Sequence, residues 1–379
     1  MKKVALVLLI ACSSARAIIF YSTGDPTYNS TAPTGDLANS GWQYEGNWLG
    51  LIGTPIAPSF FITAHHIGGG VGDTLYFDNQ SFVTITVFDD PTSDLQIFQV
   101  NGTFPIFAPL YAKQDEVGQL VVDIGHGTQR GNEIDLNGNL QGWGWGPSDG
   151  VQRWGENIVS SIYNNGVEDD LLRATFDQNG ITNECTLSSG DSGGGAFIND
   201  AGAWKLAGVN YGVDGAFYTD SSGDGPFDAA LIEMGGFWQQ NDNPPPAFVQ
   251  ISGPSAFYPT RISTKIAWIY SVIDPTGDPD GDGIPNLLEY ALHSSPIVPD
   301  VSVLTQVGRE GNFLTLTYTQ VTTATDITYV VEQSSDLVNW TTANAQTQVL
   351  STNGNVETIQ ASVDTTGSNA LFLHLRVTR

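Results

Sequence analysis

The chain is poor in cysteine and in cationic side chains. It has two cysteines, Cys12 and Cys185, and 13 lysines and arginines against 40 acidic residues. If an N-terminal leader that contains Cys12 is removed, no intrachain disulfide can form, even in an oxidising compartment. The fold must then rest on an apolar core, which a chain of 379 residues is long enough to bury.

The shortage of cations leaves a formal net charge of −27. A polyanion repels nucleic acid and anionic lipid surfaces, so we expect no nucleic-acid partner. It attracts divalent cations and suits a salty medium, in which its self-repulsion is screened. The charge by itself says nothing about a substrate.

Long apolar runs are also absent. A basic start at 2–3, a short apolar run at 4–11 and a small-x-small site at 15–17 predict a signal peptide over residues 1–17 and a secreted chain. The apolar run is too short to cross a bilayer, and no later segment is long enough, so no membrane span is expected. The alternative is a lipoprotein signal in which Cys12 is lipidated.

A glycine-rich turn holds the most informative serine. Residues 190–194 read Gly-Asp-Ser-Gly-Gly, and the glycines leave backbone N–H groups free to point at a developing oxyanion. Such turns are common in loop-rich proteins, so this turn gains weight from two upstream segments. Residues 53–66 end in His-His, and residues 93–95 read Ser-Asp-Leu after a strand-like run. The order His, Asp, Ser differs from that of α/β-hydrolases and of subtilisins.

Together these segments resemble the trypsin-like (chymotrypsin-fold) serine proteases, and residues 260–273 resemble the C-terminal helix of that family. The resemblance covers about residues 18–273 and places the catalytic histidine at His66 rather than at His65. It implies an all-β domain of two antiparallel β-barrels, followed by a helix. Short apolar runs between Gly, Asn and Asp turns agree with this fold class.

The resemblance also assigns roles in the chemistry. Ser192 would be the nucleophile, His66 the general base and then acid, and Asp94 the carboxylate that orients the imidazole. Asp89 and Asp90 compete with Asp94 for the last role. Catalysis of this kind needs no cofactor.

The same resemblance gives the surroundings of the nucleophile. The backbone N–H groups of Gly190 and Ser192 would form the oxyanion hole. Asp191 would pair with a new N-terminus at Ile18 or be held by local hydrogen bonds.

The substrate pocket is predicted from the same resemblance. Thr186 would form its base, so a neutral residue, small or apolar, is expected before the scissile bond rather than Arg or Lys. An insertion at 213–250 has no counterpart in the family core, and its carboxylates could supply a charge to the pocket. The strand that pairs with substrate is predicted at Asn210, Tyr211 and Gly212.

An acidic loop follows the protease-like region. Residues 278–289 have acids at positions 1, 3 and 5, glycine at 6 and glutamate at 12, as in an EF-hand loop. Pro285 departs from that pattern, so the loop looks more like the single calcium modules of bacterial secreted proteins, and a flexible Asp/Gly linker is the alternative. A structural Ca²⁺ ion is predicted here. Its ligands would be Asp278, Asp280, Asp282, the carbonyl of Ile284, Asn286 and Glu289.

Alternating residues at 313–318, 327–332, 356–363 and 371–377 predict a small antiparallel β-sandwich. Residues 334–340 resemble a turn of C-terminal modules of bacterial exoenzymes. Trp340 would lie in the core or stack on a sugar, and an extracellular or cell-surface ligand for this module is one option. The predicted organisation is a signal peptide (1–17), a protease domain (18–273), a calcium-binding linker (274–299) and an accessory β-sandwich (300–379).

The function predicted from these features is a secreted serine endopeptidase that acts on protein or peptide substrates through an acyl-enzyme. One alternative is a non-catalytic surface or adhesion protein on a protease scaffold. The other is an esterase with the same triad, because acyl-transfer chemistry is shared between these enzymes.

Overall fold

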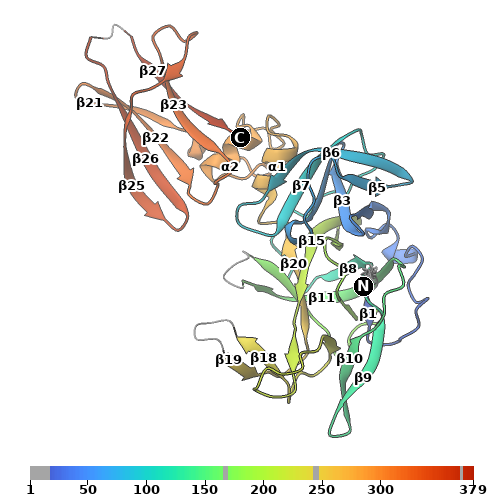
Figure 1. Cartoon of the computed structure of the whole chain (residues 1–379). Coiled ribbons are helices and arrows are strands. Elements are labelled where there is room, and N and C mark those ends of the chain that lie inside the picture. Colours follow the sequence, from blue (N-terminus) through green and yellow to red (C-terminus); the bar gives the residue numbers. More distant parts are fainter. Residues whose placement is uncertain (1–17, 165–169, 242–246, 368–369) are drawn as a thin grey trace, which may run out of the picture. The chain divides into compact units, whose positions relative to one another are not determined.

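The computed structural model describes residues 18–164, 170–241, 247–367 and 370–379 (Figure 1). The predicted signal peptide, with Cys12, lies outside the described residues. The chain divides into two compact units. Among the described residues, unit 1 comprises 18–87, 98–164, 170–241 and 247–261, and unit 2 comprises 88–97, 262–367 and 370–379.

Two closed β-barrels of six strands each form the framework of unit 1, which confirms the predicted all-β fold class. The first barrel has the strand order β2-β3-β4-β7-β6-β5, and its strands are coloured blue to cyan in Figure 1. Two of its strands, β6 and β7, are joined by the hairpin 88–97 of unit 2. The strands are β2 (Gly46–Trp48), β3 (Leu51–Ala57), β4 (Phe60–Ala64), β5 (Thr74–Phe77), β6 (Gln80–Asp89) and β7 (Leu95–Asn101).

The second barrel has the order β11-β12-β20-β15-β14-β8. Its neighbouring strands pair antiparallel, although they come from distant parts of the sequence. Its strands are β8 (Leu120–Gly125), β11 (Arg153–Tyr163), β12 (Leu171–Thr175), β14 (Gly195–Asp200), β15 (Ala203–Val213) and β20 (Ala256–Arg261).

Aromatic packing fills the first barrel. Trp48, Phe61 and Phe98 are fully buried, and their ring centroids lie 4.7–5.1 Å apart. Such rings bury a large apolar area and add a further favourable pair energy.

Cys185 is a buried free thiol, and burial raises its pKa. Cys185 is the one cysteine among the described residues, so no disulfide contributes to the described part of unit 1.

The insertion at 213–250, for which the sequence predicted no shape, is folded where the structure describes it. Its strand β17 pairs with β10, and β16, β18 and β19 form a separate sheet. Phe217, Leu231 and Phe237 belong to a buried cluster within it. The strands of these minor sheets are β1 (Ile19–Phe20), β9 (Arg130–Leu136), β10 (Asn139–Trp145), β13 (Cys185–Thr186), β16 (Phe217–Tyr218), β17 (Ala229–Leu231), β18 (Trp238–Asn241) and β19 (Ala247–Gln250).

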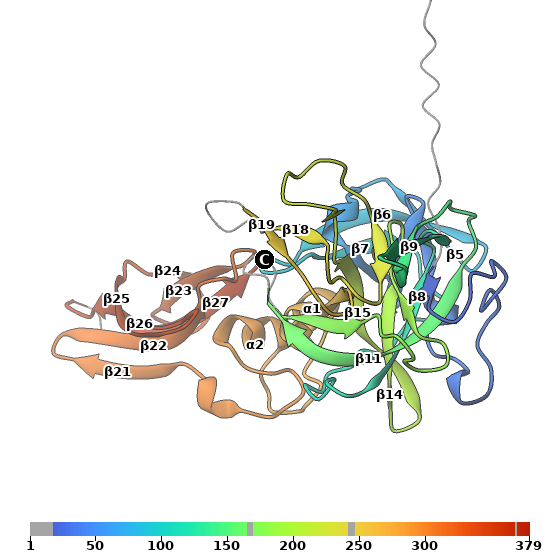
Figure 2. The same ribbon diagram turned by 90° about the horizontal axis from the view of Figure 1, so that it is seen from below.

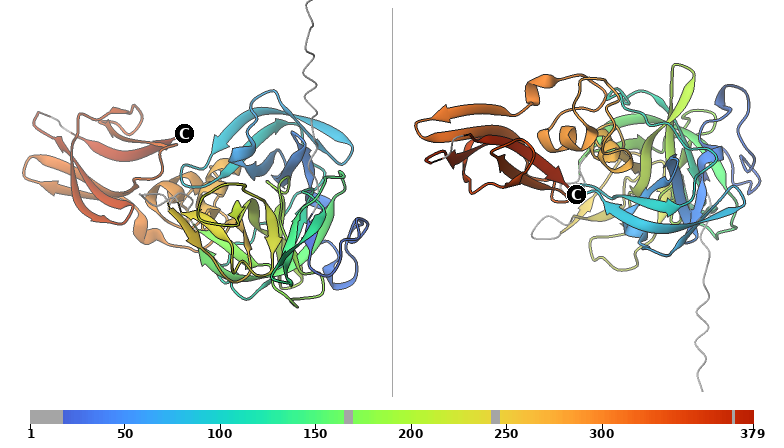
Figure 3. Two further views of the ribbon diagram at one scale, coloured as in Figure 1. Left: turned by 60° about the horizontal axis from the view of Figure 1, so that its bottom comes forward. Right: turned by 90° about the horizontal axis from the view of Figure 1, so that it is seen from above.

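Unit 2 contains two short helices and two antiparallel sheets, shown from other sides in Figures 2 and 3. The predicted helix is present as α1 (Ile266–Ile273), which packs against α2 (Asn286–Leu292). Buried Leu316, Ala361 and Leu292 belong to one core cluster. No helix of the described chain has the length and apolar character to cross a membrane. The sheets are β21 (Gln306–Glu310), β22 (Phe313–Val321), β26 (Val356–Asp364) and β25 (Gln346–Asn353), and β24 (Thr341–Thr342), β23 (Thr328–Ser334) and β27 (Phe372–Thr378).

Candidate active site and calcium loop

The structure brings His66 and Ser192 together. His66 follows β4 of the first barrel in a 3-10 turn (His65–Ile67), and Ser192 precedes β14 of the second barrel. His66 Nε2 lies 2.8 Å from Ser192 Oγ, which is hydrogen-bonding distance for a nucleophile and its base. The edge of Tyr211 faces the imidazole, with ring centroids 6.0 Å apart.

The turn that carries Ser192 needs glycine at position 193. Gly193 has φ +78°, and a Cβ there would lie 2.2 Å from the carbonyl oxygen of Ile52 and 2.6 Å from Thr63 Oγ1. Its N–H donates to the carbonyl of Asn210 at 3.0 Å. A side chain at 193 would therefore push the turn away from β3 and β4, which carry Ile52 and Thr63.

The predicted oxyanion donors are available. Among the described residues, the backbone N–H groups of Gly190 and Ser192 have no hydrogen-bond acceptor. Gly190 has φ +100°, which a residue with a side chain rarely adopts. These two N–H groups, one of which belongs to the nucleophile itself, can donate hydrogen bonds to the negative oxygen of a tetrahedral intermediate.

Asp191 is buried beneath this turn. Its Oδ1 accepts the N–H of Gly127 at 2.6 Å, and its Oδ2 accepts the N–H of Ser188 at 2.8 Å. These contacts are the local hydrogen bonds that the sequence left as one alternative. Burial raises the pKa of Asp191 to about 7, and the hydrogen bonds oppose that shift. The side chain of Ile18 is buried close by, because both it and Asp191 lie within 3.0 Å of where a Cβ on Gly125 would be.

A second buried carboxyl group, that of Asp123 on β8, lies near Asp191. Asp123 is 0% exposed, and neither of its oxygens has a hydrogen-bond partner among the described residues. Burial raises its pKa well above the usual range, and the charge of Asp191 raises it further. Sequence reasoning did not single out this residue, because one acid in an apolar strand carries no motif.

Asp94, the predicted orienting carboxylate, is buried at the residue before β7 and belongs to unit 2. Its competitor Asp90 is occupied within its own turn, where it accepts hydrogen bonds from Thr92 and Ser93. The other competitor, Asp89, accepts the side-chain amide of Gln96 at 2.7 Å. Asp94 remains the predicted third member of the triad.

A cavity of about 230 Å³ opens beside Ser192. Of the predicted pocket residues, Asn210, Tyr211 and Gly212 line it, whereas Thr186 does not. Thr186 is buried opposite Ile19 in the pairing of β13 with β1. Ser189, whose hydroxyl the sequence also offered to the pocket, lines the cavity, whereas sequence reasoning missed four lining residues, Trp145, Leu187, Ser188 and Val213.

No carboxylate of the described insertion lines this cavity. Asp214, the nearest in sequence, accepts hydrogen bonds from the N–H of Ala256 and the hydroxyl of Tyr258. Asp191 is the acid in the lining, and local N–H groups occupy both of its oxygens. The walls are therefore apolar or neutral, apart from one satisfied carboxyl group.

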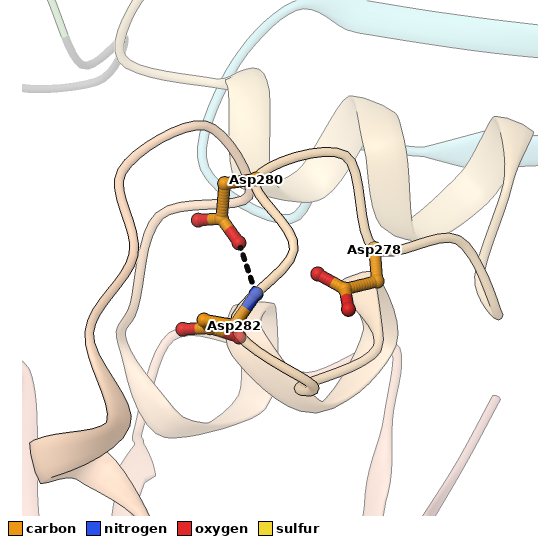
Figure 4. Close-up of side chains that lie close together, drawn as sticks. All are labelled: Asp278, Asp280 and Asp282. Atoms are coloured by element: carbon orange, nitrogen blue, oxygen red, sulfur yellow. Dashed lines mark hydrogen bonds between the residues drawn. The ribbon is translucent and has the colours of Figure 1, made fainter.

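The acidic loop of unit 2 has the geometry of a cation site. Asp278, Asp280 and Asp282 each offer one oxygen, and these oxygens lie within 4.8 Å of one another (Figure 4). Backbone N–H groups of the loop hold the carboxylates, including those of Gly281 and Gly283 on Asp278. Hard oxygen ligands at this spacing suit Ca²⁺.

The remaining predicted ligands also fit. Glu289 is 0% exposed, and neither of its carboxylate oxygens has a partner among the described residues. Burial and the three aspartates raise its pKa to about 7. Asn286 Oδ1 is likewise buried and unpaired in the described chain, and Ile284 is buried at the same turn. A buried glutamate among three acids is costly unless a cation compensates it.

Trp340 of the sandwich is half-buried, and its ring stacks on that of His374 with centroids 3.8 Å apart. His374 Nε2 lies 2.8 Å from Glu332 Oε2. One face of the indole therefore meets a side chain of its own module. A ligand for this module stays a prediction.

Solved structures similar to the chain include bacterial proteases. An inactive mutant form of Rv3671c from M. tuberculosis H37Rv is 17% identical, with a TM-score of 0.35 over 65% of this chain and 98% of that one. The active form is 16% identical (TM-score 0.34; 65% and 78% covered), and the HtrA-type protease AlgW with a decapeptide is 14% identical (0.34; 59% and 51%). No family model and no curated protein matches. TM-scores this low carry no argument, so the function rests on this chain's own geometry.

Proposed function

We propose that the chain is a serine endopeptidase whose nucleophile is Ser192. The 2.8 Å approach of His66 Nε2 to Ser192 Oγ carries this proposal. The unengaged N–H groups of Gly190 and Ser192 and the adjoining cavity support it, because they supply an oxyanion site and a place for a substrate side chain.

In the proposed mechanism, His66 takes the Ser192 proton as Oγ attacks the carbonyl carbon of the scissile bond. The carbonyl oxygen becomes negative and accepts hydrogen bonds from the N–H groups of Gly190 and Ser192. His66 then donates the proton to the leaving amine, and an acyl-enzyme remains. Water repeats the sequence and releases the acid. Asp94 would fix the imidazole tautomer and stabilise the imidazolium.

An esterase with the same triad would use the same steps, whereas a non-catalytic surface protein would need neither the close His–Ser approach nor the unengaged donors. We favour a peptidase because β15 runs along the cavity at Asn210–Gly212, where it can pair with an extended peptide. Secretion through the segment 1–17 belongs to the same proposal and rests on its sequence alone.

We also propose that the loop 278–289 binds one structural Ca²⁺ ion. Asp278, Asp280, Asp282, the carbonyl of Ile284, Asn286 and Glu289 would hold it. The unpaired buried carboxylate of Glu289 is the observation that supports this most directly. The ion would offset the repulsion among four acids, and the proposed catalytic steps do not involve it.

An active-site phosphonate probe tests the peptidase proposal. The secreted protein should be labelled at Ser192 and at no other serine, as mapped by mass spectrometry, and Ser192→Ala should abolish labelling while circular dichroism stays unchanged. Hydrolysis of casein and of peptide and lipid esters is measured in parallel. Hydrolysis of esters without hydrolysis of peptide bonds would favour the esterase alternative. Absence of labelling would overturn the proposal.

A further inference from the structure

A second cavity, of about 220 Å³, lies wholly within unit 2. It is bordered by the turn that holds Asp90 and Thr92, by the start of α1, by the end of α2 and by loops of the sandwich. Its polar lining includes Asp90, Thr92, Thr264, Lys265, Trp268 and Ser294. Neither the proposed peptidase chemistry nor the calcium loop uses this cavity.

Several donors in its wall lack partners. Among the described residues, Trp268 Nε1, Thr264 Oγ1 and Ser294 Oγ are buried and make no hydrogen bond. Trp268 is only 2% exposed, and its indole nitrogen can donate but not accept. Burying such groups without a hydrogen-bond partner is unfavourable, so a ligand that brings acceptors into the cavity is favoured.

The cavity also carries a buried positive charge. The Lys265 side chain is 8% exposed, and its Nζ donates to Thr92 Oγ1 at 2.8 Å. Asp90 Oδ2 forms a long ion pair with Nζ at 3.9 Å and also accepts a hydrogen bond from the Ser93 hydroxyl at 2.6 Å. An ammonium group has three donors, so Lys265 keeps donors for a further acceptor.

The N-terminus of α1 adds to the positive electrostatic potential in the cavity. The helix begins at Ile266, directly after Lys265, and no side chain caps it. The N–H groups of its first three residues, 266–268, have no acceptor among the described residues. The N-terminus of a helix favours negative charge, and here it coincides with an ammonium group and a buried indole N–H.

We propose that this cavity binds a small oxyanion, a carboxylate or a sulfate- or phosphate-type group. Lys265 supplies the charge, and Trp268 Nε1 with the hydroxyls of Thr264 and Ser294 supplies directed hydrogen bonds. The cavity is larger than a single oxyanion, so the bound molecule can carry several further atoms.

Occupancy has a consequence for the neighbouring turn. Asp90 and Thr92 border the cavity, and Asp94 follows two residues later. An anion held by Lys265 would compete for its contact with Thr92 and so change the conformational freedom of this turn. A resulting change in turnover rests on the proposed function, whereas binding itself does not.

Binding is tested on the mature protein with sulfate and acetate at constant ionic strength, and chloride and neutral acetamide serve as controls. The readouts are calorimetry and the indole N–H resonance of Trp268, assigned by its loss in Trp268→Phe. We expect saturable binding of at least one oxyanion and no response to acetamide. Lys265→Met and Thr264→Val should weaken binding, Lys265→Met by tenfold or more, and Lys113→Met, which removes an exposed lysine of unit 1, should not.

Absence of saturable binding of both oxyanions, or equal affinity in Lys265→Met and Lys113→Met, would overturn the proposal. So would equal binding of acetamide and acetate, because the cavity would then not select charge. Turnover is measured with and without the anion as a separate readout. Binding without any effect on turnover would remove the coupling to Asp94 and leave the anion site, and an inactive protein would still report binding.

Discussion

At the scale of single residues, the two side chains that meet come from different barrels, and each lies in a loop next to a barrel strand. His66 is the second residue after β4, and Ser192 is three residues before β14. The sequence contains two adjacent histidines, and only their position in the matched segment separates them. The structure places both in a 3-10 turn, not on a strand, and it is His66 that contacts Ser192.

Histidine variants test this assignment. His66→Ala should lower kcat by about 10⁶-fold, as expected when a triad that acts as a unit loses its base. Asp94→Asn should lower it by about 10⁴-fold through the wrong imidazole tautomer. His65→Ala should stay within about twofold of the parent, as an exposed surface substitution. Steady-state hydrolysis of a peptide amide is the measurement, and a larger loss in His65→Ala than in His66→Ala would reverse the assignment.

Asp123 gives a prediction about pH and stability. Its pKa in the folded protein is raised, so above about pH 4 the folded state holds a proton that the unfolded chain releases. Stability must then fall as pH rises, by about 1.4 kcal/mol per pH unit for this group, until pH reaches the folded pKa. The amide in Asp123→Asn does not titrate, so this variant should lack the contribution of Asp123 to the pH dependence. Its stability relative to that of the parent should therefore increase as pH rises.

Urea unfolding of Asp123→Asn and of the parent at pH 5, 6, 7 and 8 measures the effect. Asp224→Asn is the matched control, because it removes one carboxylate from an exposed position. A stability difference between Asp123→Asn and the parent that stays constant over this range would show that Asp123 is ionised in the folded protein.

At the scale of elements, the acidic loop proposed to bind Ca²⁺ lies between two helices that pack on each other. It runs from residue 278, just after α1, into α2, which contributes Asn286 and Glu289. Four acids converge where unit 2 changes from helix to sandwich, so the loop without a cation is strained by repulsion.

Calcium should therefore stabilise unit 2. Adding Ca²⁺ to the chelator-treated protein should raise its melting temperature, by an amount that grows with ligand excess and corresponds to about 2.7 kcal/mol at one hundred times Kd. The double variant Asp280→Ala/Asp282→Ala should not respond. Asp220→Ala/Asp224→Ala removes the same charge from exposed residues of unit 1 and serves as the control. The melting temperatures are measured by differential scanning calorimetry with and without EDTA. If Asp280→Ala/Asp282→Ala responds to Ca²⁺ as strongly as the control variant does, the loop is not the calcium site.

At the scale of the whole molecule, the cavity beside Ser192 is assembled from three separated segments. β10 contributes Trp145, the loop before the nucleophile contributes residues 187–189, and β15 with its end contributes residues 210–213. Because these segments meet only in the folded chain, counting back from Ser192 pointed to Thr186, which faces Ile19 instead.

The lining still predicts a neutral preference, on different grounds. Trp145, Leu187 and Val213 give apolar walls, and Asp191 is already satisfied by backbone donors. Cleavage should therefore follow apolar residues at least tenfold more often than Arg or Lys, since an unpaired buried cation costs more than 1.4 kcal/mol. Peptide-library profiling tests this, with Ser192→Ala as the blank. A dominant basic residue would mean that Asp191 is available to substrate.

The sequence by itself determined the all-β class, the strands of the sandwich and the residues with chemistry in them. Alternation at 313–318 and 356–363 became β22 and β26, and the acidic loop brought together the three aspartates its spacing predicted. Such signals are local, because strand period and loop spacing act over a few residues. Only the tertiary structure decided which residues line the cavities, that Asp123 is buried without a partner among the described residues, and how the described part of the insertion at 213–250 packs. Each of these depends on contacts between segments distant in the chain, and no local pattern encodes which of the many apolar strands will meet.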